Sequence, residues 1–172
     1  MPQTAEDSLR LLRRLRQVRE YTTQPVSDEI LNDILEVGRW SGSGGNRQPT
    51  EVVVVKDPEL KKKFGEWGAK PASAGAVALL LVTASDDAMV DEGRMAERLM
   101  LAANSHGLGA GISTLKNEGP EEVKKLLGIP TEKRARVLIA VGHTDVEARR
   151  TLPKSTDPLR KAMSHYAHRG HW

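Results

Sequence analysis

The chain has 172 residues, a formal net charge of +3 and no cysteine. At this length one domain with a substantial core is expected, because folding removes roughly 70% of the surface of such a chain from water. The lack of cysteine excludes a disulfide framework, a thiolate nucleophile and a cysteine-ligated metal. The first residues lack an apolar signal core and the stretch 74–84 is too short to cross a bilayer, so we expect a cytoplasmic protein.

Two amphipathic helices are predicted in the first quarter of the chain. Thr4 has the character of an N-cap, and leucines then recur at helical spacing, which predicts a helix over 5–17 with arginines on its other face. Ser27, followed by two acidic residues, marks the start of a second helix that should end near Trp40.

The rest of the chain alternates between strands and helices. Four segments are rich in β-branched or apolar residues and are predicted as strands: 51–57, 75–85, 109–114 and 136–143. Three further helices are expected at 58–67, 91–106 and 120–128, the last two with a glycine stop. These segments predict a sandwich of about four strands and five helices. The part from residue 144 on has no strong period and is expected to be an extended arm.

Two glycine clusters invite comparison with nucleotide-binding loops. "GSGGNRQ" (42–48) lacks the Lys-Ser/Thr pair that follows the last glycine of a P-loop, and it precedes a strand where a P-loop precedes a helix. "GLGAGIS" (107–113) follows a helix and opens a strand, the reverse of the dinucleotide fingerprint. Neither cluster is therefore predicted to hold a phosphate.

The arginines of the first helix leave two interpretations open. A run of charge is usually a solvated helix face, but Arg16 and Arg19 lie where the helix gives way to an extended segment, a place where guanidinium groups can converge on a phosphate. Nucleic-acid binding is disfavoured, because no aromatic residues alternate with the arginines to stack bases. The closely spaced histidines His165, His168 and His171 have no carboxylate among them, so we predict no metal site. No catalytic triad is suggested either.

Four segments in order resemble the FMN-dependent nitroreductase family along nearly the whole chain. Residues 16–60 resemble its N-terminal block, in which "RRSxRxF" leads through a helix to an "APSxxNxQPW" loop and a strand. Residues 93–112 resemble its long central helix and Gly-Leu-Gly turn, 125–143 a later strand, and "TLPKSTDPL" (151–159) its "PKSR" segment. Each segment is moderately specific, and their shared order makes the resemblance strong.

The resemblance implies an α+β fold over 1–172 as a single domain, with a mainly antiparallel or mixed central sheet flanked by helices. It also implies a homodimer that exchanges the C-terminal arm (144–172) and binds FMN in each of two interface sites. NADH or NADPH would deliver hydride to flavin N5 and leave, and a nitroaromatic, quinone or similar small electron acceptor would take its place. The flavin carries this chemistry, so no catalytic residue is expected. The alternative is a flavin-binding or storage module with little turnover.

The basic N-terminal motif is matched in part. Arg16 matches the second arginine of "RRS", while Leu15 replaces the first, which usually binds phosphate. Gln17 replaces the serine and can still donate a hydrogen bond. Arg19 matches the basic residue near flavin N1 and the C2 carbonyl, where positive charge stabilises the reduced anion.

The "PKSR" segment departs from the family in a similar way. Lys154 matches its lysine, but Thr156 replaces its arginine. With two cationic partners of the phosphate missing, either Arg16, Arg149 or Arg150 supplies the charge, or FMN binds more weakly than usual.

The glycine-rich loop is matched better. Ser43, Gly44 and Asn46 match "SxxN", which reaches the flavin from the partner subunit, and Gln48 matches the glutamine of "QPW". Its small residues let the backbone approach a ligand closely. Thr50 replaces the tryptophan of that motif.

Two further positions follow from the resemblance. The backbone N–H groups of Thr114 and Leu115 fall where the family places its donor to flavin N5. Between the strand and helix that flank "DDAMVD" (86–91) the chain lacks the helices that cover the flavin in many family members. The site is therefore expected to be open and to discriminate poorly between substrates.

Overall fold

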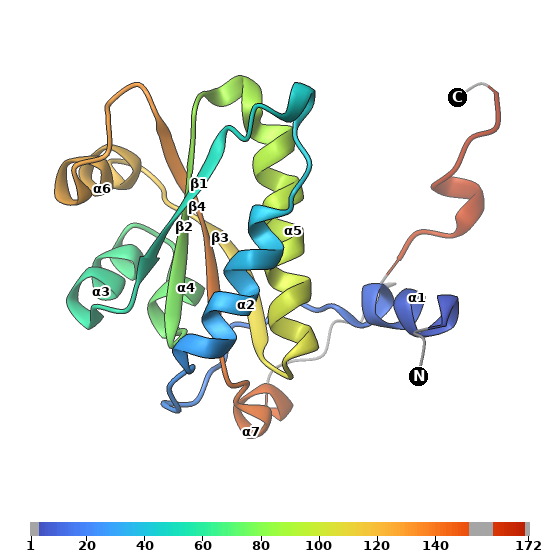
Figure 1. Cartoon of the computed structure of the whole chain (residues 1–172). Coiled ribbons are helices and arrows are strands. Elements are labelled where there is room, and N and C mark those ends of the chain that lie inside the picture. Colours follow the sequence, from blue (N-terminus) through green and yellow to red (C-terminus); the bar gives the residue numbers. More distant parts are fainter. Residues whose placement is uncertain (1–3, 152–159, 171–172) are drawn as a thin grey trace.

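The computed structural model describes residues 4–151 and 160–170, with a four-stranded antiparallel sheet at its centre (Figure 1). The strand order is β1-β2-β4-β3. The bounds are Thr50–Val55 for β1, Val77–Thr83 for β2, Gly109–Thr114 for β3 and Arg134–Gly142 for β4. All four strands were predicted, the third with these same bounds.

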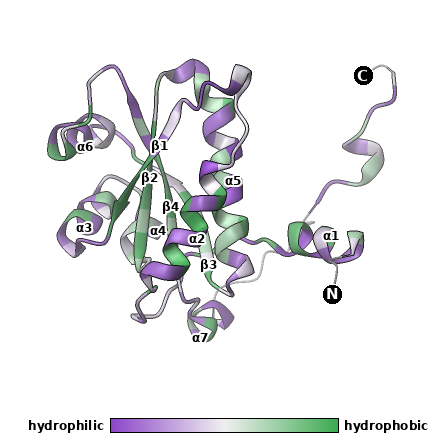
Figure 2. Ribbon diagram, in the orientation of Figure 1, coloured by the Kyte–Doolittle hydropathy of each residue, from purple (hydrophilic) through white to green (hydrophobic). Residues whose placement is uncertain are grey.

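Helices cover both faces of the sheet (Figure 1). One face packs against α2 (Asp28–Arg39) and α5 (Met89–Ser105), and the other against α3 (Pro58–Glu66), α4 (Lys70–Ala74) and α6 (Gly119–Leu127). Every residue of β2 is buried, because the strand is central and covered on both sides. Figure 2 shows the apolar character of the strands, and the two core clusters are aliphatic apart from Phe64 and Trp67.

Helix starts follow the predicted capping signals. In α1 (Ala5–Arg14) the Thr4 hydroxyl accepts from the N–H of Asp7, whose carboxylate accepts from Thr4 in return, and these bonds hold the pKa of Asp7 below its usual range. Ser27 caps α2 and Asp57 caps α3. The capping predictions are confirmed.

The end of α1 was predicted wrongly. The helix ends at Arg14 rather than at residue 17, and Leu15 already has an extended conformation (φ −55°, ψ 129°). The reason is tertiary: Gln17 and Val18 lie along the outer edge of β3, where the Val18 N–H donates to the Ala110 carbonyl over 2.9 Å. Bonding to the sheet edge replaces further helical bonds that the leucine spacing favours.

Two short helices were not predicted. α4 spans one turn with Pro71 near its start. α7 (Val146–Arg150) lies in the expected arm and begins at Asp145, whose carboxylate accepts from the Ala148 N–H over 2.8 Å. The arm is therefore not extended from residue 144, and a further 3-10 turn spans Met163–His165.

Helix α1 and residues 160–170 lie apart from the rest of the chain (Figure 1). None of the residues of α1 is buried, and Leu9 and Leu12 keep about half of their surface exposed, although the helix is strongly amphipathic (Figure 2). Among the described residues, no helix is both long and apolar enough to cross a membrane.

A cluster of two charged side chains and one indole lies at the C-terminal end of α2. The Glu36 carboxylate accepts from the Arg39 guanidinium at 2.6 and 2.8 Å and from the Trp40 indole at 2.8 Å. These hydrogen bonds lower the pKa of Glu36 from its ordinary 4.5 to about 2. A carboxyl group with a lowered pKa in the folded protein stabilises it above the ordinary pKa, and this effect disappears as the pH falls towards the folded value.

We therefore expect Glu36→Gln to destabilise the protein near neutral pH and to matter less in acid. Urea unfolding at about pH 6 and about pH 3 measures this, with the wild type as reference. The stability difference between the two proteins should be larger at the higher pH. A difference that is the same at both pH values would contradict the assignment.

Candidate functional site

The Gln17 side chain, together with the backbone bond of Val18, holds the segment that follows α1 at the open edge of β3. The Gln17 amide nitrogen donates to the Ile112 carbonyl over 2.6 Å, and its oxygen accepts from the Ile112 N–H over 3.1 Å. Gly111 makes this approach possible, since a Cβ there would lie 2.1 Å from the Val18 carbonyl oxygen. The segment is thus held against the sheet edge at a fixed depth.

The next backbone donor along this edge belongs to Thr114. The Leu115 N–H donates to the Arg136 carbonyl over 2.9 Å, so it is committed to β4, and the Leu115 side chain is fully buried. Bonded and non-bonded pairs alternate in an antiparallel ladder, so the N–H of the exposed Thr114 points away from β4, toward the open edge. Of the two predicted positions, the structure leaves the Thr114 N–H available.

A cavity of about 790 Å³ adjoins this edge, between α1 and α5. Its walls combine apolar side chains, one carboxylate and three arginines: Leu12, Leu15, Ala96, Met100, Ile112, Glu97, Arg13, Arg16 and Arg160, with Gln17 and Gly93. Arg16 donates to the carbonyls of Arg13 and Leu15, at 2.6 and 2.8 Å, and thereby caps the last turn of α1. The predicted residues Arg16 and Gln17 both line this cavity.

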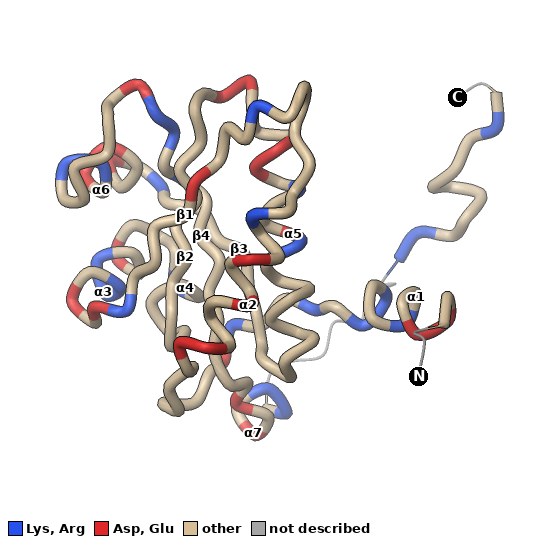
Figure 3. The backbone as a smooth tube through the Cα atoms, in the orientation of Figure 1, with Lys and Arg blue, Asp and Glu red and all other residues tan. Residues whose placement is uncertain are grey.

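A second cavity, of about 460 Å³, has a basic lining. Arg10, Arg14, Arg16 and Arg149 line it together with polar residues that include Asn104, Ser105 and Thr144, and Asp7 is the one acidic residue in the described lining. Arg10 and Arg14 belong to α1 and Arg149 belongs to α7, and Figure 3 shows basic residues in both helices. Arg16 lines both cavities, which makes it the link between them.

The structure distinguishes between the two arginines of α7. The Arg149 side chain is 38% exposed, and its Nε lies 4.0 Å from the Glu20 carboxylate, a long ion pair. Arg150 is 70% exposed and donates to the Glu147 carboxylate over 2.6 Å. Only Arg149 lines the basic cavity with Arg16. The predicted Lys154 and Thr156 lie outside the described residues.

The loop before β1 has an unusual backbone. Asn46 and Gln48 have positive φ angles of 54° and 49°, as does Gly45 at 58°. Left-handed conformations at non-glycine residues cost about 1–3 kcal/mol each and cluster at functional sites. The Ser43 hydroxyl stabilises the turn by accepting from the Gln48 N–H over 2.8 Å, which leaves the side chains of Asn46 and Gln48 exposed.

The predicted site residues fall into separate groups within one chain. Ser43 and Gln48 line a cavity of about 270 Å³ at the end of α2, whereas Arg16 lines both cavities beside α1 and Gln17 lines the larger one. Arg19 is exposed and lines none of the described cavities. In the described part of the chain, no cluster of three or more His, Asp or Glu could hold a metal ion.

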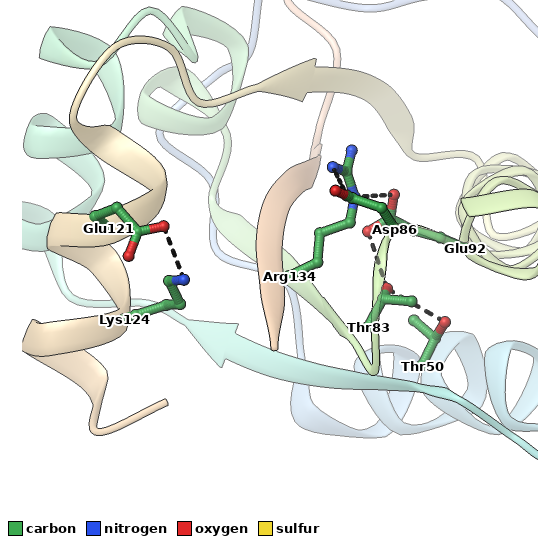
Figure 4. A network of polar contacts seen from close by, with 7 residues as sticks. All are labelled: Thr50, Thr83, Asp86, Glu92, Glu121, Lys124 and Arg134. Atoms are coloured by element: carbon green, nitrogen blue, oxygen red, sulfur yellow. Dashed lines mark hydrogen bonds and ion pairs between the residues drawn. The ribbon is translucent and has the colours of Figure 1, made fainter. Parts of the chain in front are cut away.

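A chain of buried polar contacts lies under the loop and was not predicted (Figure 4). Thr50 and Thr83 have their hydroxyl oxygens 3.4 Å apart, Thr83 donates to Glu92 over 2.9 Å, and Arg134 donates to the other oxygen of Glu92 over 3.3 Å. Arg134 also bonds Asp86 at 2.7 Å. A signal was present in the sequence: Glu92 shares the apolar stripe of Ala96 and Leu99, where a carboxylate needs a buried partner.

Comparisons with known proteins identify the family and the fold. The family model described as the Nitroreductase family matches residues 12–88 and 81–143. The chain is 28% identical over 151 residues to an NADPH-flavin oxidoreductase of Vibrio harveyi and 27% identical over 154 residues to an FMN reductase [NAD(P)H] of Bacillus subtilis. The alignments cover 76% and 74% of this chain, and the chain spans 62% of each relative. The structure of an FMN-dependent nitroreductase from Clostridium difficile R20291 has the same fold (TM-score 0.77, 20% identity, 94% and 98% of the two chains).

Proposed function

Because this chain belongs to the nitroreductase family, we propose that it is an FMN-dependent oxidoreductase that takes electrons from NAD(P)H and passes them to a small acceptor such as a nitroaromatic or a quinone. Its similarity to two relatives, an NADPH-flavin oxidoreductase and an FMN reductase [NAD(P)H], supports the cofactor and the donor. The observation that carries the proposal is the edge of β3, where Gln17 binds Ile112, the Thr114 N–H is open, and Arg16 lines both of the neighbouring cavities.

The residues present fit FMN. The larger cavity lies within the range of small-molecule sites, roughly 300–1,000 Å³. The basic cavity offers Arg14, Arg16 and Arg149 to a phosphate dianion, and guanidinium groups bind phosphate oxygens in pairs. The open N–H of Thr114 offers a donor for a heteroatom of a flat ring at the sheet edge.

Each residue has a separate task in this proposal. Arg16 and Arg149 hold the phosphate, Gln17 fixes the segment and offers its second amide hydrogen, and the Thr114 N–H donates to the ring. Arg19, two residues beyond Gln17, supplies positive charge beside the ring. When bound, FMN supplies the redox chemistry, accepting a hydride from NAD(P)H and passing electrons to the acceptor. The chain binds and orients the cofactor and needs no acid, base or nucleophile.

We further propose that the site is completed by a second copy of the chain, which folds as one domain over 1–172. Within one copy the Asn46 and Gln48 loop lines neither cavity beside α1, and the leucines of α1 are uncovered. A homodimer that exchanges the terminal segments would cover those leucines, and would bring Ser43, Gly44 and Asn46 to the partner's flavin. Lys154 and Thr156 remain predicted contacts of the phosphate.

Steady-state kinetics test the reaction order. With FMN bound, NADPH or NADH and a quinone acceptor varied against each other should give parallel double-reciprocal lines, because the donor leaves before the acceptor binds. Intersecting lines would contradict the alternating use of one site. A protein that binds FMN but does not oxidise either nicotinamide would be a flavin-storage module instead.

A further inference from the structure

Three residues of α5 hold the loop that carries Asn46 and Gln48. Arg98 donates to the Trp40 carbonyl over 3.2 Å at the start of the loop, and Asp91 accepts from the Gly44 N–H over 3.3 Å in its middle. Glu92 reaches the end of the loop indirectly, through Thr83 and Thr50 (Figure 4). The helix therefore holds the loop at three separate points.

The third of these anchors is the most buried. Thr83 is fully buried, and Glu92 and Thr50 are 3% and 8% exposed. A carboxylate only accepts hydrogen bonds, so Thr83 donates its proton to Glu92, and its oxygen is left to accept from Thr50. The charge of Glu92, balanced by Arg134, thus sets the direction of the whole chain of bonds.

The loop needs such anchors because of its backbone. Gln48, in the left-handed region, is two residues before Thr50, and a strained conformation persists only when its surroundings enforce it. Between them, the Pro49 carbonyl accepts from the Ala84 N–H over 2.9 Å. The backbone bond at Pro49 and the side-chain bond at Thr50 together fix the last residues of the loop to the end of β2.

We propose that Thr50, Thr83, Glu92 and Arg134 form a positioning relay that sets the place of Asn46 and Gln48 against the partner's flavin. The inference rests on the proposed function, and Thr50, the first member of the relay, stands where the motif that this loop resembles has a tryptophan. These residues do not touch the cofactor. They act through the loop, so loosening any one of them should weaken contacts that the loop makes rather than those of the arginines.

Four variants test the relay by FMN titration, the visible spectrum of the bound flavin and thermal unfolding of the apoprotein. Thr50→Val replaces the hydroxyl with a methyl group of similar size, and Glu92→Gln keeps the volume but removes the charge. Each should raise the Kd for FMN about fivefold, the effect of one lost hydrogen bond, and shift the bound spectrum toward that of free FMN. Thr50→Ser keeps the hydroxyl and should behave as the wild type.

Val123→Ala is the matched control, since it removes methyl groups from the core under α6, on the other face of the sheet. It should lower the unfolding temperature and leave the Kd and spectrum unchanged. If Thr50→Val and Glu92→Gln bind FMN as the wild type does, or if Val123→Ala weakens binding as much as they do, the relay is structural only and the inference is wrong. Failure of the wild type itself to bind FMN would overturn the proposed function as well.

Discussion

Arg149→Glu is expected to raise the Kd for FMN by about two orders of magnitude. The change removes one of the arginines that line the basic cavity with Arg16 and places a negative charge where the phosphate would bind. A lost charge-assisted hydrogen bond costs about 1.5–3 kcal/mol, and repulsion adds to that. Isothermal titration of the apoprotein with FMN measures the change. The Kd of the variant should also depend less on salt concentration than that of the wild type, because one attractive charge pair is lost.

The neighbouring Arg150→Glu provides a control with the same change in net charge. Arg150 is 70% exposed, pairs with Glu147 and lines no described cavity. The Kd of the Arg150→Glu variant for FMN should therefore stay within about twofold of the wild-type value. Because Arg149 also faces Glu20, Arg149→Met serves as a variant without added repulsion. Equal effects of the two charge reversals would show that general electrostatics, and not the cavity, determine binding.

Gly111→Ala is expected to destabilise the protein strongly and to abolish FMN binding. The new Cβ would lie 2.1 Å from the Val18 carbonyl oxygen and 3.2 Å from the Gln17 amide nitrogen, and the backbone atom cannot rotate away. The segment that carries Arg16 and Gln17 must therefore leave the edge of β3. Overpacking of this severity costs about 3 kcal/mol, or roughly 10 °C in unfolding temperature at this chain length.

Gly93→Ala is the control for replacing a glycine by alanine, and it should change the stability of the protein in the opposite direction. A Cβ at Gly93 meets nothing within 4 Å, and alanine favours a helix over glycine by about 1 kcal/mol. Its unfolding temperature should therefore rise or stay the same. If Gly111→Ala unfolded at the wild-type temperature, the close approach of Val18 to the sheet edge would be wrong.

Local signals predicted the elements of the fold well. The Thr4, Ser27 and Asp57 caps and the glycine stops lie within a few residues of the helices that they limit, so these local signals and the residue spacing together located five helices and four strands. The end of α1 was missed because the competing interaction, with Ala110 and Ile112, comes from nearly a hundred residues away. α7 was missed because a single turn has no period to detect.

The sequence predicted several residues of the candidate site but not how they are arranged. The sequence left Arg16, Arg149 and Arg150 as equal sources of charge, and only the fold of α7 shows which one faces Arg16. Thr114 and Leu115 were likewise equivalent until strand pairing committed the N–H of Leu115 to β4. The relay below the loop depends on the register between β1 and β2, and β2, which is buried on both faces, has no apolar–polar alternation that would fix this register.

The central claim is that this chain moves electrons from a nicotinamide to bound FMN, and anaerobic reduction tests it most directly. The FMN-loaded protein, mixed with NADH or NADPH in the absence of oxygen, should lose the visible absorption band of oxidised flavin within seconds. Addition of a quinone should then restore the band. Retention of the band with both donors, in a protein whose flavin dithionite still bleaches, would contradict the claim.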